Sequence, residues 1–340
     1  MNTEALRTVA ATYGTPTYIF DVREVEARIR LLRSLLPEDT GLCFAVKANP
    51  FLIPYVADLV DRLEVCSPGE YEICIQEQIA PEKIVVSGVN KTYESMKRIL
   101  SYSKGAGIYT IESEEHAKIL RTLAEKNQMP LSVLIRLSSG NQFGVDAETF
   151  LRLAKEIQES PYLTLAGVHY YAGTQKRQSK LEKELDTLTA FAKTFEEETG
   201  TVLNELEYGA GMKVSYFIND SEKDQRESEP EPQIQALAEK LRTCAYGKKT
   251  IELGRFLVSM SGYYLTRVMD VKRTAQPGFL ILDGGIHQIN YYGWMMGMKQ
   301  PEIEVLAEKD GDCFICADRS VQSMMCWRGM LPCMIRKKAM

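Results

Sequence analysis

The stretch Leu42-Cys43-Phe44-Ala45-Val46-Lys47 is a short apolar run that ends abruptly at a lysine. A run of this length and composition is typical of a strand that is buried on both faces, as in a parallel sheet. Similar runs recur along the chain, separated by amphipathic segments. With residues 42–46 as the first strand, the following strands are expected at residues 63–65, 84–86, 107–110, 131–137, 165–170, 204–208 and 250–252.

The segments between these runs have the apolar spacing of helices. Residues 113–126, 148–159 and 180–198 are the clearest examples. Ser113 is well placed to cap the first of them, because acidic residues fill the opening turn that follows it. Eight strands, each followed by a helix, are the count of a (β/α)₈ barrel of the TIM type. We therefore expect an α/β barrel over residues 25–255.

The remainder of the chain has a different pattern. Residues 263–271 alternate as strands do, and residues 279–283 form an apolar run after a Pro-Gly turn. We expect residues 256–316, together with residues 1–24, to form a second, mostly β domain that is incomplete at its C-terminal end. Residues 219–233, which include Glu229-Pro230-Glu231-Pro232, are expected to form a solvated acidic loop.

The overall composition excludes several classes of protein. The chain has 340 residues, of which 45% are hydrophobic and 26% are charged, and its net charge is −5. A nucleic-acid-binding protein usually presents a basic face, and a membrane span needs about 20 consecutive apolar residues. The first residues also lack the basic and apolar regions of a signal peptide. We therefore expect a cytoplasmic protein that binds neither nucleic acid nor membrane.

In a barrel of this kind, the residues at the C-terminal ends of the strands gather at one mouth. Lys47 follows the first strand, His169 ends the sixth, Gly209-Ala210-Gly211 follows the seventh, and Glu252 and Arg255 stand at the eighth. Each has an ordinary alternative: a strand-end charge, a core histidine, a tight turn, or an ion pair between Glu252 and Arg255. Their occurrence together, each at a predicted strand end and in this order, predicts a functional site.

This set of residues meets the chemical needs of pyridoxal phosphate. The amine of Lys47 can form a Schiff base with the aldehyde. The N–H groups of the glycine loop, with Arg255, can bind the phosphate. The imidazole of His169 can stack on the ring, and the carboxylate of Glu252 can keep the pyridine nitrogen protonated, which makes the ring a strong electron sink.

The chain resembles the fold-type III pyridoxal-phosphate-dependent amino-acid decarboxylases. That family includes the diaminopimelate, ornithine and arginine decarboxylases and relatives in siderophore and antibiotic pathways. The resemblance runs from about residue 17 to about residue 317. Its motifs are Val46-Lys47-Ala48-Asn49, Glu64-Val65-Cys66-Ser67-Pro68-Gly69-Glu70, Gln142-Phe143-Gly144, Gly167-Val168-His169, Gly209-Ala210-Gly211, Glu252-Leu253-Gly254-Arg255 and Asp283-Gly284-Gly285. Two positions depart from the family pattern, where Ala210 replaces a glycine and Leu253 replaces a proline.

The resemblance implies a pyridoxal-phosphate-dependent carboxy-lyase that acts as a homodimer on an amino-acid-type substrate. The implied catalytic residues are Lys47, His169 and Glu252, and no metal is implied. The implied cofactor-binding residues are Lys47, His169, Thr174, Gly209, Ala210, Gly211, Glu252, Gly254 and Arg255. The segment at residues 170–175 is more similar to members that serve siderophore or antibiotic assembly, which favours a carboxyl group on a larger, conjugated amino acid.

Three other functions remain open. Racemases of the same fold type place an arginine against the pyridine nitrogen, so Glu252 favours decarboxylation over racemisation. A non-catalytic relative would bind pyridoxal phosphate without releasing CO₂. A barrel that used Lys47 for aldolase-type chemistry would need no phosphate loop at residues 209–211.

The end of the chain does not follow the family pattern. Four of the eight cysteines lie in the last 28 residues, and residues 315–327 stand where the family has a Gly-x-Leu-Cys motif and an Asp-Val-Leu-like run. In a shifted reading frame, the codons of Met324-Met325-Cys326-Trp327 must spell Asp-Val-Leu. We therefore expect residues 317–340 to be an aberrant tail produced by a frameshift. The resemblance implies that the replaced segment supplies a cysteine proton donor and a tyrosine that contacts the phosphate, so weak or absent turnover is expected of a chain truncated in this way.

Other interpretations of this tail are possible. Cys313, Cys316, Cys326 and Cys333 could bind zinc, but they lack the paired spacing of a zinc ribbon. A disulfide framework is disfavoured in the cytoplasm. The apolar and basic residues of the tail could also form an amphipathic docking helix.

Overall fold

The computed structural model describes residues 1–273, 278–285, 287–290, 298–306 and 314–318. The chain divides into two compact units. The larger unit contains Val22–Val214 and Glu227–Met260. The smaller unit contains Met1–Asp21, Ser215–Arg226 and the described residues from Ser261 onward.

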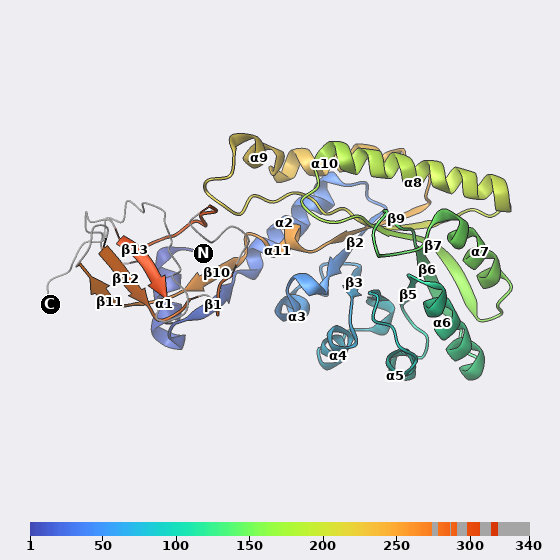
Figure 1. Cartoon of the computed structure of the whole chain (residues 1–340), viewed down its shortest axis with the longest axis horizontal. Helices are drawn as coiled ribbons and strands as arrows, with labels where there is room; N and C mark the ends of the chain where they lie inside the picture. The colour runs from blue at the N-terminus through green and yellow to red at the C-terminus, as the bar shows by residue number, and fades with distance from the viewer. Residues whose placement is uncertain (274–277, 286, 291–297, 307–313, 319–340) are drawn as a thin grey trace. The chain divides into compact units, whose positions relative to one another are not determined.

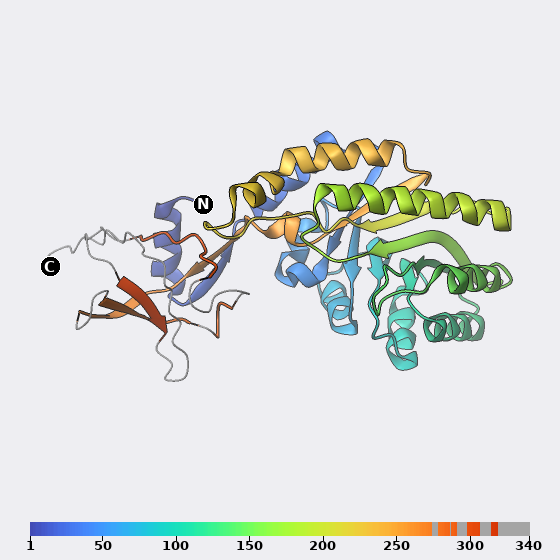
Figure 2. The same cartoon turned by 45° about the horizontal axis from the view of Figure 1, so that its top comes forward.

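The larger unit is a closed barrel of eight parallel strands, which confirms the predicted TIM-type fold (Figures 1 and 2). The last strand pairs with the first, so that Thr40 lies opposite Lys249 and Phe44 opposite Leu253. Every expected strand overlaps an observed one. The barrel strands are β2 (Thr40–Ala45), β3 (Arg62–Val65), β4 (Ile84–Val86), β5 (Ile108–Ile111), β6 (Leu131–Arg136), β7 (Leu163–Tyr171), β8 (Glu205–Gly209) and β9 (Lys248–Leu253).

Helices lie around the barrel and pack their apolar faces against it (Figure 2). Ser113 caps α6 as expected, because its hydroxyl accepts a hydrogen bond from the N–H of His116. No helix in the described ranges is both long enough and apolar enough to span a membrane. The helices of this unit are α2 (Val22–Leu35), α3 (Ile53–Val56), α4 (Pro68–Gln76), α5 (Tyr93–Ser103), α6 (Glu114–Asn127), α7 (Ala147–Gln158), α8 (Gln178–Thr199), α10 (Pro230–Arg242) and α11 (Arg255–Val258), with 3₁₀ turns η1 (Val46–Ala48), η2 (Pro50–Leu52) and η3 (Pro81–Lys83).

The prediction of a solvated loop at residues 219–233 is wrong for much of its length. Helix α9 (Glu222–Glu227) lies inside it, and α10 begins at Pro230, a residue that suits the first turn of a helix. Farther along α10, four apolar residues recur three or four positions apart and are buried: Ile234, Leu237, Ala238 and Leu241. This apolar face packs α10 beside α8 (Figures 1 and 2), which outweighs the acidic character of its first turn.

The smaller unit contains two short sheets. Helix α1 (Thr3–Tyr13) precedes β1 (Thr17–Phe20), which pairs antiparallel with β10 (Gly262–Leu265). A second sheet has the order β11 (Val268–Lys272), β12 (Gly278–Leu282) and β13 (Phe314–Asp318). Residues 319–340, which make up most of the predicted aberrant tail, lie outside the described residues, as do the side chains of the clustered cysteines. The frameshift therefore stays a prediction.

Candidate functional site

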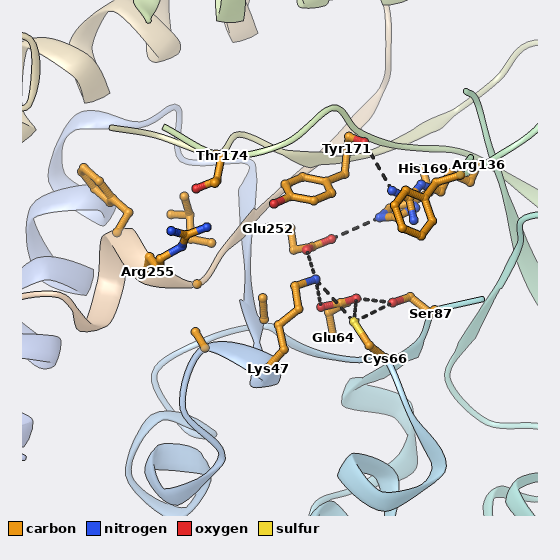
Figure 3. Close-up of a pocket in the computed structure, with 18 of the residues that line it drawn as sticks. Lys47, Glu64, Cys66, Ser87, Arg136, His169, Tyr171, Thr174, Glu252 and Arg255 are labelled. Carbon is orange, nitrogen blue, oxygen red and sulfur yellow. Dashed lines mark hydrogen bonds and ion pairs between the residues drawn. The ribbon is translucent and has the colours of Figure 1, made fainter. Parts of the chain in front are cut away.

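A pocket of about 650 Å³ opens among the C-terminal ends of the barrel strands (Figure 3). Two of the nine predicted site residues, Gly209 and Ala210, do not line it but belong to the same loop as Gly211. The other seven lie in its wall: Lys47, His169, Thr174, Gly211, Glu252, Gly254 and Arg255. The barrel thus brings the sequence-predicted residues together around one cavity.

Strand β2 ends at Ala45, and the 3₁₀ turn η1 (Val46–Ala48) follows at once. Lys47 lies in this turn, at the C-terminal end of the strand, and lines the pocket. Its Nζ atom lies 3.0 Å from Oε2 of Glu64 and 3.4 Å from Oε1 of Glu252. Partial burial would lower the pKa of Lys47, but the two carboxylates, Glu252 first, raise it well above its usual value. The amine is therefore held as an ammonium at neutral pH.

Glu252 is buried beside this amine and contacts His169 through its other oxygen. Oε2 of Glu252 lies 3.1 Å from Nε2 of His169. Burial alone would raise the pKa of Glu252, but the charge of Lys47 and the hydrogen bond from His169 lower it to about 2. Nδ1 of His169 is buried and has no hydrogen-bond partner in the described part of the chain. The alternative of an ion pair between Glu252 and Arg255 is wrong, because Glu252 is paired with Lys47 and His169.

Among the pocket residues without a role predicted from the sequence, Glu64, Cys66 and Ser87 form one hydrogen-bonded group. Oε1 of Glu64 accepts hydrogen bonds from the hydroxyl of Ser87 and, at 2.8 Å, from the thiol of Cys66. Burial and the charge of Glu64 raise the pKa of Cys66 to about 12, so Cys66 stays protonated. These contacts orient the Glu64 carboxylate towards Lys47 (Figure 3). The family motif at residues 64–70 is the sequence feature that points to this group, since it contains both Glu64 and Cys66.

The opposite side of the pocket offers donors for an anion. Gly211 has a φ of +58°, and a Cβ at this position would lie 2.2 Å from the carbonyl oxygen of Gly173. Its own N–H donates to no acceptor among the described residues. The guanidinium of Arg255 likewise has no hydrogen-bond or ion-pair partner within the described ranges. Unpaired backbone N–H groups and an arginine are the donors that a phosphate group prefers.

A buried charge network lies behind the pocket. Nζ of Lys91 donates to the carbonyl oxygen of Gly88 and, at 3.1 Å, to Oγ1 of Thr110, and it lies 3.6 Å from Glu112. Glu112 also accepts a hydrogen bond of 2.7 Å from Arg136, which lines the pocket. Burial lowers the pKa of Lys91 to about 8, and the charge of Glu112 only partly offsets this effect. The network holds Arg136 in place at the pocket wall.

A family model matches residues 22–259 of the chain, a span that contains the whole barrel. Its description is "Pyridoxal-dependent decarboxylase, pyridoxal binding domain". The match includes every residue of the predicted site.

Individual relatives agree with this match. A diaminopimelate decarboxylase from Actinosynnema pretiosum is 31% identical over 299 residues, which are 82% of this chain and 66% of that protein. An L-glutamyl-[BtrI acyl-carrier protein] decarboxylase from Niallia circulans is 25% identical over 312 residues, which are 84% of this chain and 71% of that protein. The crystal structure of diaminopimelate decarboxylase from Helicobacter pylori complexed with L-lysine has the same fold, with a TM-score of 0.78, 21% identity, and coverage of 95% of this chain and 82% of that one.

Proposed function

The chain belongs to the family of pyridoxal-dependent decarboxylases, and from that premise we propose that it removes a carboxyl group, as CO₂, from an amino acid or an amino-acid conjugate. Pyridoxal phosphate is the cofactor of this family. One observation carries the proposal: the amine of Lys47 stands in the pocket between the carboxylates of Glu64 and Glu252, at 3.0 and 3.4 Å.

The pocket residues fit this cofactor at both of its ends. Lys47 can hold the aldehyde carbon through a Schiff base. The unpaired N–H of Gly211 and the unpaired guanidinium of Arg255 fit the phosphate. We assign the phosphate to the loop Gly209-Ala210-Gly211 together with Thr174, Gly254 and Arg255.

When bound, pyridoxal phosphate supplies an electron sink for the charge that remains on the substrate after CO₂ leaves. The Glu252 carboxylate, whose pKa is about 2, would hold a proton on the pyridine nitrogen. His169 fixes that carboxylate through the 3.1 Å hydrogen bond, and its ring can stack on the cofactor. A carboxylate at the ring nitrogen keeps the ring a strong electron sink, whereas racemases of this fold type place an arginine there, so Glu252 favours decarboxylation over racemisation.

We further propose a conjugated amino acid as the substrate, of the kind used in siderophore or antibiotic assembly. Two observations support this choice. The segment at residues 170–175 is similar to such members, and the relative from Niallia circulans is named for a glutamyl group on an acyl-carrier protein. We also propose that the protein acts as a homodimer, as the family resemblance implies, and that it works in the cytoplasm.

The proposal is tested by measuring CO₂ release from carboxyl-labelled substrates by the protein loaded with pyridoxal phosphate. The panel would contain diaminopimelate, ornithine, lysine, arginine and a glutamyl group on a carrier protein. Release from at least one substrate, abolished by Lys47→Ala, supports decarboxylation. A racemised product without CO₂ would indicate a racemase. A cofactor absorbance band with neither product is the result expected of a non-catalytic binding protein, or of a chain whose turnover is lost with the C-terminal catalytic segment.

A further inference from the structure

Lys176 is a buried lysine that holds both ends of the loop Gly209-Ala210-Gly211. It lies between β7 and α8, and only 3% of its surface is exposed. Its Nζ atom donates a hydrogen bond of 2.9 Å to the carbonyl oxygen of Gly209. Its backbone N–H donates a second bond, also of 2.9 Å, to the carbonyl oxygen of Gly211. One residue thus orients the first and the last carbonyl group of the loop.

This arrangement determines where the N–H groups of the loop point. In a trans peptide the carbonyl group and the N–H of the next residue point in opposite directions. Lys176 donates hydrogen bonds to the carbonyl oxygens of Gly209 and Gly211. The N–H groups that follow these carbonyls, those of Ala210 and Met212, therefore point away from Lys176. Gly211 and Met212 line the pocket, whereas Lys176 does not. Lys176 thus sets the directions of the N–H groups of Ala210 and Met212, which stand on either side of Gly211 in the chain.

The ammonium group of Lys176 is itself held firmly. It donates a hydrogen bond of 2.7 Å to Oε2 of Glu184, a buried residue of α8. The same oxygen accepts a hydrogen bond of 2.7 Å from the hydroxyl of Tyr208, the residue that precedes Gly209 in β8. Lys176 and Tyr208 both donate to the Glu184 carboxylate, and this shared contact fixes the ammonium group of Lys176 next to Gly209, the last residue of β8.

We propose that Lys176 is a positioning residue for the phosphate site: it fixes the loop at residues 209–211 so that the loop's N–H groups meet the phosphate of pyridoxal phosphate. This inference rests on the proposed function. The competing interpretation is a purely structural ion pair between Lys176 and Glu184. Replacement of a buried ion pair often changes stability little, so unfolding measurements do not separate the two roles. A measurement specific to the phosphate does.

The test compares the affinities of the protein for pyridoxal phosphate and for pyridoxal, which lacks the phosphate, by titration of the absorbance band. The dissociation constant for pyridoxal divided by the dissociation constant for pyridoxal phosphate measures the contribution of the phosphate site. We expect Lys176→Met to reduce this ratio by about tenfold, because oriented N–H donors are lost, while the affinity for pyridoxal changes little. Lys180→Met is the matched control, since Nζ of Lys180 also lies near Glu184, at 3.9 Å, but is half-exposed and is not bonded to the loop.

Removal of Lys176 alone leaves the Glu184 charge buried and could prevent folding. The double variant Lys176→Met, Glu184→Gln contains neither charge and retains a partner for Tyr208, and we expect it to show the same reduced ratio. An unchanged ratio in the variants, or an equal loss of affinity for both ligands, overturns the role of Lys176. A wild-type protein that does not prefer pyridoxal phosphate over pyridoxal instead contradicts the proposed function.

Discussion

Nζ of Lys47 and Oε1 of Glu252 lie 3.4 Å apart, although 205 positions separate the two residues in the chain. Closure of the barrel explains this contact. Strands β2 and β9 are neighbours, and Cys43 pairs in register with Glu252, so the end of the first barrel strand lies beside the end of the last. The pair therefore forms only when the complete barrel closes.

Replacement of Glu252 by Gln tests its assigned role at the pyridine nitrogen. A neutral amide cannot hold the proton there, so we expect kcat for CO₂ release to fall by about 100-fold, while the affinity for pyridoxal phosphate changes much less. Steady-state kinetics and absorbance titration give the two values. A Glu252→Gln enzyme with wild-type kcat would exclude this role.

Replacement of Glu64 by Gln should make Lys47 a better nucleophile towards the cofactor at neutral pH. Glu252 and Glu64 raise the pKa of Lys47, and each unit by which that pKa falls increases the fraction of neutral amine about tenfold. We therefore expect stopped-flow measurements to show capture of pyridoxal phosphate up to about tenfold faster in Glu64→Gln. Glu70→Gln is the control, because Glu70 accepts the N–H of Cys66 and does not contact Lys47. Unchanged or slower capture in Glu64→Gln would refute this prediction.

Gly211→Ala should damage both stability and cofactor binding. An alanine there has to adopt a φ near +58° and brings its Cβ within 2.2 Å of the carbonyl oxygen of Gly173. The left-handed conformation alone costs about 1–2 kcal/mol. Gly200→Ala is a matched control, since Gly200 has a φ of +68° with no atom within 4 Å of the added Cβ. In urea unfolding and cofactor titration, Gly211→Ala should lose more stability than the control and bind pyridoxal phosphate more weakly. Equal losses of stability with unchanged affinity in both variants would refute the assignment of the loop.

Lys91 should make the stability of the protein depend on pH. Its pKa falls from 10.5 to about 8 in the folded state, so between these values the unfolded chain binds more protons at this site than the folded chain does. Stability contributed by this site therefore rises with pH. We expect the free energy of unfolding of the wild type, relative to Lys91→Met, to increase by about 2 kcal/mol from about pH 7.5 to about pH 10. Lys97→Met, which alters an exposed lysine, provides the baseline. A difference that stays constant or falls with pH contradicts the burial of a charged Lys91.

The barrel and the centre of the site could be predicted from the sequence because parallel strands leave a strong pattern. Strands buried on both faces are apolar runs, so polar residues at their ends, such as Lys47 and Glu252, stand out. Glu64 could not be interpreted in the same way, since its role depends on a hydrogen bond from Ser87, which follows the neighbouring strand β4 and comes beside Glu64 only in the folded barrel.

The role of Lys176 could not be predicted from the sequence. Its burial depends on Glu184 in α8 and on Tyr208 in β8, and only the folded barrel brings these three residues together. The start of α10 was missed for another reason. Its first turn is rich in proline and glutamate, which resembles a loop, whereas its buried face begins only at Gln233 and Ile234.

The attachment of pyridoxal phosphate to Lys47 is tested most directly by borohydride reduction of the loaded protein, followed by peptide mass spectrometry. We predict that the pyridoxyl phosphate group is found on Lys47, and that Lys47→Ala loses both this label and the cofactor absorbance band. A label on another lysine in the wild-type protein, or an absorbance band that persists in Lys47→Ala, would contradict the assignment of Lys47 as the residue that holds the cofactor.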